Sequence, residues 1–345
     1  MIYPLKLKPV YVEKIWGGDG LKRIFSRSLP YEKTGESLEI AETAIISNGI
    51  YKGIPFYEVL KKEPEKYLGK NILSENPFPL LLKLIDASSD LSIQVHPSNQ
   101  YNEKNERHFI GKNEAWYILS APENAKIIAG LKPGVPKEVL SKLAGSEKIR
   151  NVLNSIPVKK GDVINIPAGM VHAITKSIVL MEIQQNSDRT YRLYDYGRVW
   201  KDGKRELHIN EALEAIDYNL PENKNPVKGL SIKEDGVLKT YYICNNHFSL
   251  IKYEFENYYT EESDIDKFFI LTLAEGSGKI EYSDKAMELS PGESIFIPAA
   301  LGKYMIRGKG IIIKTFIGHK EKDFLSPLLS YGYSMEEITE KTWVT

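Results

Sequence analysis

The feature that most constrains the fold is a short pattern that occurs twice along the chain. The segment Gly161–His172 aligns without a gap with Gly292–Lys303, and each reads as a strand followed by a turn that begins with Pro-Ala. The apolar segments Trp116–Leu119 and Phe268–Leu271 also match. Because self-similarity of this kind indicates repeated structural units, we expect two related units in one chain.

Most of the remaining sequence consists of short apolar runs separated by Gly, Pro, Asn and Asp. Since such runs recur roughly every ten residues with turn residues between them, the pattern favours a mainly β fold of the sandwich or barrel type. The predicted strands are Leu91–His96, Ala115–Leu119, Ala125–Ala129, Val163–Ile166, Ile178–Ile183, Phe248–Tyr253, Phe268–Leu273, Lys279–Tyr282, Ser294–Ile297 and Ile311–Phe316.

Three segments have helical periodicity instead. Pro55–Tyr67 carries apolar residues at helical spacing, and Pro136–Leu153 is led by a proline suited to a first helical turn. Asn210–Ile216 reads as a short helix capped by Asn210. These segments divide the chain into three parts. We predict an N-terminal β unit over 1–203 with helical insertions at 55–67 and 136–153, a connecting helical segment over 204–239, and a C-terminal β unit over 240–345.

The composition limits the partners and the compartment. Lys plus Arg and Asp plus Glu both total 46, which gives no support to bulk nucleic-acid or anionic-membrane binding. Cys244 is the single cysteine, so no intrachain disulfide is expected, as in a reducing compartment. The N-terminal sequence lacks a signal-peptide pattern, and no apolar run reaches the ~18 residues of a membrane span. We expect a cytoplasmic protein.

Two histidines and a carboxylate near strand-like runs predict a metal site. His96, Glu114 and His172 offer the three protein ligands typical of a catalytic metal, which keeps a position for substrate or water. Gln94 lies two residues before His96 and therefore on the same face of a strand, so its amide oxygen is a candidate fourth ligand. These donors suit Zn(II), Fe(II), Mn(II) or Co(II), and the sequence does not choose among them.

The second copy of the repeat lacks these ligands. Lys303 stands where His172 stands in the first copy, and on a looser alignment Tyr253 falls opposite His96. We therefore expect the C-terminal unit to keep the fold and to have lost the metal.

Three cations accompany the predicted ligands. Lys112 lies two residues before Glu114 and should share its face, and Lys83 lies in an otherwise apolar strand, where a buried charge is costly unless it meets an anion. Arg192 lies in a tyrosine-rich strand, and its guanidinium is suited to hold a phosphate or an enediolate oxygen. An anionic substrate such as a phosphosugar would need such groups.

These residues leave three kinds of function open. A metal-dependent sugar-phosphate enzyme uses both the metal and the cations. Two histidines and one carboxylate also describe a non-haem Fe(II) oxygenase. A chain with one degenerate copy is, thirdly, compatible with a non-catalytic sugar-phosphate-binding protein.

The arrangement of these motifs resembles one family. The Gly-x5-Pro-x-Gly-x2-His segment resembles the second cupin motif. The order of five segments resembles type I mannose-6-phosphate isomerase in its short bacterial form, over nearly the whole chain. The segments are Phe78–Asp86, Leu91–Pro97, Gly111–Tyr117, Pro167–Ala173 and Glu182–Tyr196. Gly35-Glu36-Ser37 is similar to a further family element. Leu38, Asn113 and Met170 depart from the residues common there.

The resemblance implies a fold, a reaction and a cofactor. It implies two cupin-type jelly-roll units and the interconversion of mannose 6-phosphate and fructose 6-phosphate with one zinc ion per chain. It makes Gln94, His96, Glu114 and His172 the zinc ligands.

The resemblance also makes Arg192 an active-site residue, with Lys83 and Lys112 lining the substrate site. The reaction passes through a cis-enediol, whose charge the zinc with Arg192 or Lys112 would stabilise. The base stays open between a metal-bound water, Glu114, a histidine and Lys112.

Overall fold

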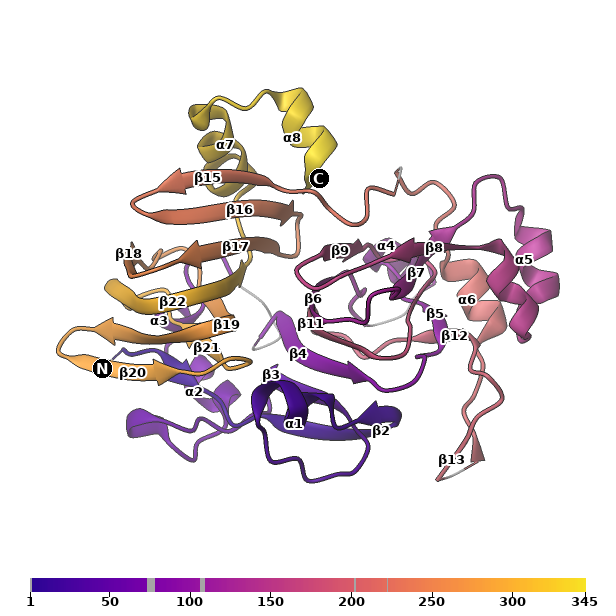
Figure 1. The fold of residues 1–345 in the computed structure, drawn as a ribbon, viewed down its shortest axis with the longest axis horizontal. Coiled ribbons are helices and arrows are strands. Elements are labelled where there is room, and N and C mark those ends of the chain that lie inside the picture. The colour runs from indigo at the N-terminus through magenta and orange to yellow at the C-terminus, as the bar shows by residue number, and fades with distance from the viewer. Residues whose placement is uncertain (1, 73–77, 106–108, 202, 222) are drawn as a thin grey trace. The chain divides into compact units, whose positions relative to one another are not determined.

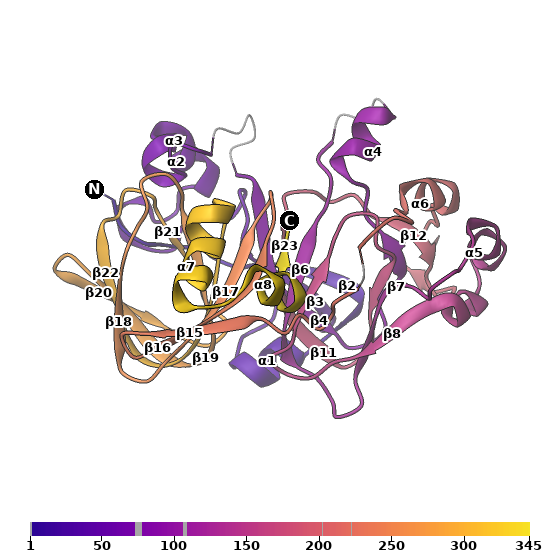
Figure 2. The same cartoon turned by 90° about the horizontal axis from the view of Figure 1, so that it is seen from above.

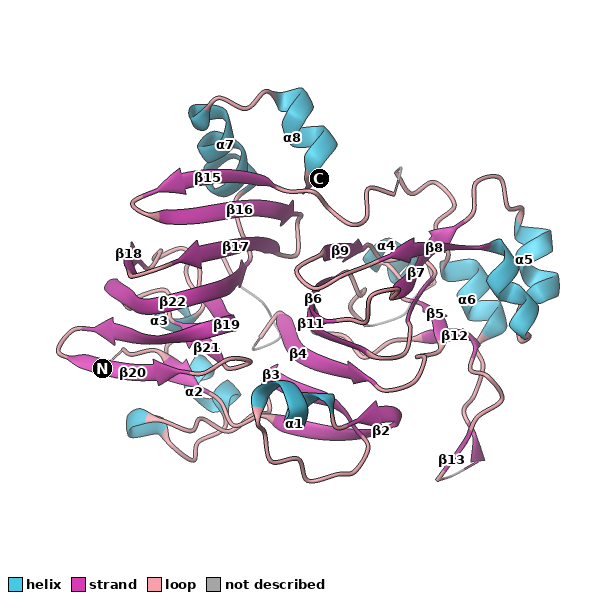
Figure 3. Ribbon diagram, in the orientation of Figure 1, coloured by secondary structure: helices cyan, strands magenta, loops and turns pink. Residues whose placement is uncertain are grey.

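The computed structural model describes residues 2–72, 78–105, 109–201, 203–221 and 223–345, and strands predominate among them (Figure 3). The chain divides into two compact units. Unit 1 comprises 1–10, 38–82 and 227–345, and unit 2 comprises 11–37 and 83–226. Both units are therefore built from separate stretches of sequence, whereas the division predicted above is contiguous. That division stays a prediction.

Unit 2 contains the first copy of the repeat, and its strands belong to two large sheets and one small two-stranded sheet, of which the six-stranded sheet includes a few residues of unit 1. The six-stranded sheet has the order β2 (Val10–Gly18), β3 (Thr34–Ile40), β4 (Leu80–Ala87), β11 (Ile178–Gln185), β6 (Glu114–Ser120) and β9 (Val163–Ile166). The five-stranded sheet has the order β12 (Tyr191–Tyr194), β5 (Ile93–Val95), β10 (His172–Ile174), β7 (Lys126–Leu131) and β8 (Leu153–Pro157). The pair β13 (Val199–Trp200) and β14 (Gly203–Lys204) is separate.

An apolar core joins the two large sheets of unit 2. Trp116 and Leu180 from the six-stranded sheet belong to the same buried cluster as Ile127 and Ile174 from the five-stranded sheet. Alternating apolar residues on facing sheets produce such a core. Short helices lie outside it, and α5 and α6 lie side by side (Figure 3). The helices of unit 2 are α1 (Gly20–Phe25), α4 (Asn99–Lys104), α5 (Lys137–Leu143), the 3₁₀ turn η2 (Glu147–Val152) and α6 (Ile209–Ala215).

Unit 1 contains a ten-stranded sheet whose strands are seen side by side in Figure 1. Its main order is β1 (Leu5–Lys6), β21 (Ser294–Ile297), β19 (Phe269–Tyr282), β22 (Lys303–Phe316), β17 (Ser249–Phe255), β16 (Val237–Cys244) and β15 (Leu230–Glu234). Off this path, β18 (Tyr258–Glu262) pairs with β22, β20 (Lys285–Leu289) with β19 and β23 (Trp343–Val344) with β16. The helices of unit 1 are η1 (Gly49–Tyr51), α2 (Phe56–Lys62), α3 (Pro64–Tyr67), the π-helix η3 (Lys320–Leu325), α7 (Ser326–Tyr331) and α8 (Met335–Lys341).

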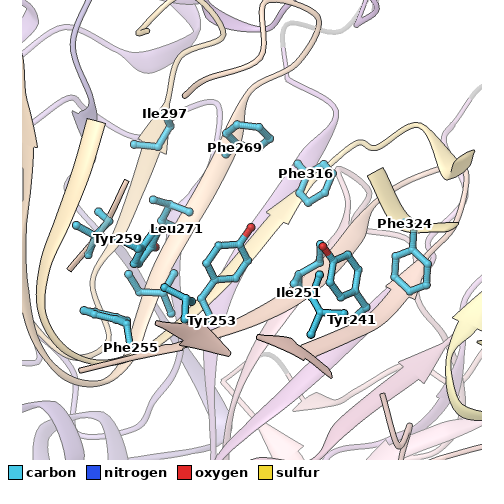
Figure 4. Packing of buried hydrophobic residues seen from close by; sticks show 14 of the residues in the cluster. Tyr241, Ile251, Tyr253, Phe255, Tyr259, Phe269, Leu271, Ile297, Phe316 and Phe324 are labelled. Carbon is cyan, nitrogen blue, oxygen red and sulfur yellow. The ribbon is translucent and has the colours of Figure 1, made fainter. Parts of the chain in front are cut away.

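Aromatic side chains fill the interior of unit 1. Tyr253, Phe255 and Tyr259 lie close together, with Phe269 and Phe316 nearby in the same buried cluster (Figure 4). Helix α7 lies beside β15 in both views of the fold (Figures 1 and 2), which extends the cover over this end of the sheet. No helix in the described part of the chain combines the length and apolar character needed to cross a membrane.

The predicted mainly β, two-unit cupin-type fold is confirmed, with some differences in the elements. The sheets of the described residues run from one edge strand to another, so they are open rather than closed barrels. Two predicted strands, Phe268–Leu273 and Lys279–Tyr282, form the single strand β19. A register shift between Leu273 and Glu275 bends the strand where we expected a loop, and Gly276 continues it at a φ of +90°.

The helix predictions were wrong in detail. The segment Pro136–Leu153 contains α5 and then η2, because Gly145 at a φ of +77° interrupts the helix. Helix α6 begins at Ile209, so Asn210 lies inside the helix and is not its cap. Only α6 is helical among the described residues of 204–239, and β15 already belongs to the sheet of unit 1.

The strand register defines which residues of the two copies correspond. In the gapless alignment β9 matches β21, and the starts of β10 and β22 match as well. Glu114 pairs with Ile166, and Phe269 pairs with the matching Ile297. Phe269 therefore takes the place of Glu114, and the predicted match of Trp116–Leu119 with Phe268–Leu271 is displaced by three residues.

The predicted match of Tyr253 with His96 was also wrong. Gln94 on β5 pairs with His172, and Glu262 on β18 pairs with the matching Lys303. Strand β18 is therefore the counterpart of β5, whereas Tyr253 lies on the preceding strand β17.

One expected consequence concerns the core of unit 1. Phe296 is fully buried, and its ring lies 5.0 Å from that of Phe56 and 5.2 Å from that of Phe268. We expect Phe296→Ala to lower the free energy of unfolding by about 3–5 kcal/mol, because it leaves a cavity among packed rings. Urea-induced unfolding measures this loss. The control Ile50→Ala, at a residue that is 67% exposed, should change it by less than about 0.5 kcal/mol; equal losses would contradict the packing described here.

Candidate metal centre

Three side chains that are far apart in the sequence converge inside unit 2. His96, Glu114 and His172 are each 1% exposed, and one potential ligand atom from each lies within 4.8 Å of the others. The two carboxylate oxygens of Glu114 lie 3.3 Å from the Nε2 atoms of His96 and His172, one oxygen to each ring. This is the only such group of three or more His, Cys, Asp or Glu side chains within the described ranges.

The strands of unit 2 bring these residues together. Glu114 begins β6 and His172 begins β10, while His96 directly follows β5. The turn before His172 is fixed because the Gly169 N–H donates to the carbonyl of His96 at 2.8 Å. Gly169 has a φ of +88°, which favours glycine at this position. The Pro-x-Gly-x2-His pattern thus corresponds to a turn that places His172 next to His96.

Each imidazole presents its Nε2 atom to the centre. The Nδ1 atom of His96 is 2.8 Å from the carbonyl oxygen of Arg189, and that of His172 is 2.8 Å from the carbonyl oxygen of Met170. Because a carbonyl only accepts, both Nδ1 atoms carry the proton and both Nε2 atoms keep a free electron pair. This is the tautomer that metal-binding histidines adopt.

Burial keeps the centre in the protonation states that bind a cation. Burial and the Lys112 ammonium lower the pKa of His96 to about 3, and burial also lowers the pKa of His172. Burial alone would raise the pKa of Glu114, but Lys112 and His96 outweigh it and hold that pKa well below its usual value. At neutral pH two neutral imidazoles therefore face one carboxylate, as metal ligands require.

A buried ammonium group stands where these donors converge. Lys112 Nζ lies 2.9 Å from His96 Nε2 and donates to Glu114 Oε2. Two of the three donors thus already hold an ammonium group, and the types of all three suit a divalent metal. The residues therefore fit a metal ion that takes the place of the ammonium.

Gln94 lies beside the same centre. Its side-chain amide is 3.3 Å from His172 Nε2, with the nitrogen assigned to that side, and its oxygen accepts from Ser92 Oγ at 3.0 Å. The two amide atoms of a glutamine are interchangeable by rotation, and a hydroxyl both donates and accepts. After such a rotation the oxygen of Gln94 faces the centre, as a fourth ligand would.

Arg192 lies on the same face of the five-stranded sheet as Gln94 and His172. It pairs with Gln94 across β12 and β5, and Gln94 pairs with His172 across β5 and β10. Because directly opposite residues of adjacent strands share a face, Arg192, Gln94 and His172 form one row. Arg192 Nε is buried and has no hydrogen-bond partner among the described residues.

Lys83 forms an ion pair with a buried carboxylate, as expected for a lysine in an apolar strand. Its Nζ lies 2.9 Å from Glu182 Oε1, and Lys112 Nζ lies 3.9 Å from the same oxygen. Burial lowers the pKa of Lys83, but the charges of Glu182 and Glu36 outweigh it and raise that pKa above its usual value. Lys83 is therefore a charged group close to the candidate ligands.

The sequence analysis did not assign a role to Glu182. Its Oε2 accepts from the Trp116 indole N–H at 2.8 Å, and it links Lys83 to Lys112. A signal was present in the sequence, since Glu182 and Gln184 are polar residues two apart in a strand that is apolar from Ile178 to Met181. Such alternation places both on one face.

Known proteins match this chain over most of its length. Residues 4–125 match the family model described as phosphomannose isomerase type I, catalytic domain, and residues 238–317 match that of the mannose-6-phosphate isomerase cupin domain. A putative mannose-6-phosphate isomerase of Bacillus subtilis is 36% identical over 91% of this chain and 99% of its own length. The mannose-6-phosphate isomerase of Streptococcus mutans is 34% identical over 91% of this chain and 98% of its own.

Solved structures agree with this. The structure of the mannose 6-phosphate isomerase from Bacillus subtilis superposes with a TM-score of 0.83 at 34% identity, covering 90% of this chain and 99% of that one. The chain is thus a cupin-type protein of two units, and one of these units contains a buried His–Glu–His cluster that is a candidate metal site. Within that class the chain belongs to the type I mannose-6-phosphate isomerase family, whose members are metal-dependent enzymes.

The centre yields a direct expectation about metal binding. We expect His172→Ala to lose most of the bound divalent metal, because it removes one of the two imidazole ligands and leaves too few donors. Elemental analysis of the purified protein measures the metal content. His247→Ala is the matched control, since His247 lies in unit 1 and outside the His96–Glu114–His172 group. Unchanged metal content in His172→Ala would show that the centre does not bind metal as described.

Proposed function

We propose that this chain interconverts mannose 6-phosphate and fructose 6-phosphate with one zinc ion per chain, held by Gln94, His96, Glu114 and His172. The observation that carries the proposal is the combination of two free Nε2 atoms with a buried carboxylate in a chain of this family. The neighbouring cations Lys83, Lys112 and Arg192 account for an anionic substrate. The single cysteine supports a cytoplasmic location as part of the same proposal.

The metal would supply Lewis-acid polarisation of the sugar oxygens during proton transfer between C1 and C2. Moving that proton creates negative charge on O1 and O2 in a cis-enediol. Arg192 lies in the row that contains Gln94 and His172, and this position supports a role for its guanidinium in stabilising the charge. Lys112 would act on the same oxygens once a metal displaces its ammonium group from His96 and Glu114.

The buried carboxylate of Glu182 would position the cations. It lies within ion-pair distance of both Lys83 and Lys112, so it holds two ammonium groups close together without leaving them uncompensated. Because the surrounding residues are buried, charge interactions in this region are stronger than in water.

Turnover of mannose 6-phosphate tests the proposal. We expect the purified protein to form fructose 6-phosphate in a coupled assay, to lose this activity after treatment with a chelator, and to regain it with zinc. The activity should be unchanged without oxygen, which separates an isomerase from a non-haem iron oxygenase. A zinc-loaded protein that binds the phosphosugar without converting it would contradict the isomerase and favour a binding protein.

A second test concerns Arg192. We expect Arg192→Ala to lower kcat by about 10²-fold, because charge on the enediolate loses a preorganised donor. Arg192→Lys should recover only part of the loss, since an ammonium lacks the forked geometry of guanidinium. Arg23→Ala is the control, at a side chain that is 70% exposed. Turnover of Arg192→Ala within a few-fold of the unmodified protein would exclude a catalytic role.

A further inference from the structure

We propose that Gln184 is a positioning residue for the metal centre: its buried amide holds the bend that presents the carbonyl of Arg189 to His96. This inference rests on the proposed metal site and deepens it. Within the described residues, Gln184 forms no hydrogen bond of its own with a candidate ligand. It would act through the segment after β11, whose backbone carbonyl accepts the proton of His96 Nδ1.

Gln184 lies in β11 directly opposite Glu114, so its side chain is on the same face of the sheet. It is fully buried, and its Nε2 donates to the carbonyl oxygens of Gln185 at 2.9 Å and Ser187 at 2.7 Å. Its Oε1 has no hydrogen-bond partner among the described residues. Both donated bonds are thus directed at the backbone of the bend that follows the strand.

The bend is held at a second point by Ser187. The Ser187 N–H donates to the carbonyl of Gln185 at 2.7 Å, and its hydroxyl donates to the carbonyl of Ile110 at 2.8 Å. The same hydroxyl oxygen lies 3.5 Å from the backbone nitrogen of Arg189. Gln184 and Ser187 therefore restrain the backbone that leads to the carbonyl of Arg189.

The bend ends at the candidate ligand. The carbonyl of Arg189 accepts from His96 Nδ1 at 2.8 Å. The guanidinium of Arg189 takes no part in this contact, since it is 53% exposed and lies over the ring of Phe109. The contribution of this segment to the centre is therefore the direction of one backbone carbonyl.

The two imidazoles differ in how their protons are held. His172 Nδ1 donates to the carbonyl of Met170, two residues away in its own turn. His96 depends instead on a carbonyl 93 residues further along the chain. If that carbonyl moves, the Nδ1–H form of His96 loses its acceptor, and a proton at Nε2 would block the metal. Partners of this kind typically change metal affinity by about 10- to 100-fold.

Zinc affinity of the whole chain, measured by competition with a chelator and without sugar, tests the inference. Gln184→Met keeps the length of the side chain but removes both donated bonds, and Ser187→Ala removes only the hydroxyl. We expect each to raise the Kd for zinc by about 10- to 100-fold. Activity at saturating zinc should return toward that of the unmodified protein, because all ligands remain.

Thr272→Val is the matched control. Thr272 is fully buried in unit 1, and its hydroxyl hydrogen-bonds to Ser294 at 2.9 Å, so the substitution also removes one buried hydrogen bond. It should leave the Kd for zinc unchanged. The ¹⁵N shifts of the His96 ring provide an independent reading, since they report the share of the Nδ1–H form, which should fall in Ser187→Ala.

Unchanged zinc affinity in Ser187→Ala would overturn the inference, and this variant decides alone if Gln184→Met does not fold. An equal loss in Thr272→Val would also overturn it, because general destabilisation would then be the cause. The proposed function is tested separately: a chain that binds zinc as expected here but does not isomerise mannose 6-phosphate would contradict that function and leave the role of Gln184 standing.

Discussion

The candidate site depends on one constraint, the burial of several charges of opposite sign in unit 2. Lys83, Lys112, Glu114 and Glu182 are all largely buried, and each cation lies close to a carboxylate. A single buried ion costs several kcal/mol, so the four side chains are tolerated only as a connected set. Removing one member would cost about 3–5 kcal/mol, because its partner would remain charged and unpaired. The same set concentrates positive and negative groups beside two neutral imidazoles.

Unit 1 has the same pattern of strands, but different side chains fill its interior. Phe269 takes the register position of Glu114, and Lys314 pairs with Leu271 as Glu182 pairs with Trp116. Lys314 Nζ lies 2.9 Å from Glu261 and 3.6 Å from the centre of the Phe269 ring. Glu261 also accepts from the hydroxyls of two tyrosines, Tyr253 and Tyr304. An ion pair between Lys314 and Glu261 therefore lies among aromatic rings inside unit 1. Figure 4 shows Tyr253, Phe269 and Phe316 among these rings.

Much of the fold and of the candidate site followed from the sequence. Short-range patterns were sufficient for strands such as β9 and β21, whose predicted bounds agree with the structure. His96, Glu114 and His172 were identified because their motifs lie at strand ends, and the structure brings them within ligand distance. Gly145 interrupts one predicted helix, and pairing with β22 continues β19 past the register shift near Glu275, where a loop was expected. Tertiary pairing overrides such local preferences.

By itself, the sequence determined the repeated β units, the types of the candidate metal ligands and the presence of cations suited to an anionic substrate. These depend on residue identity and on the two-residue period of a strand. Only the tertiary structure decided that Glu182 joins Lys83 to Lys112, that Phe269 replaces Glu114, and that a carbonyl 93 residues away holds the proton of His96. The reason is physical: hydrogen bonds and ion pairs between distant segments depend on strand register and backbone direction, which the pairing of the whole sheet fixes.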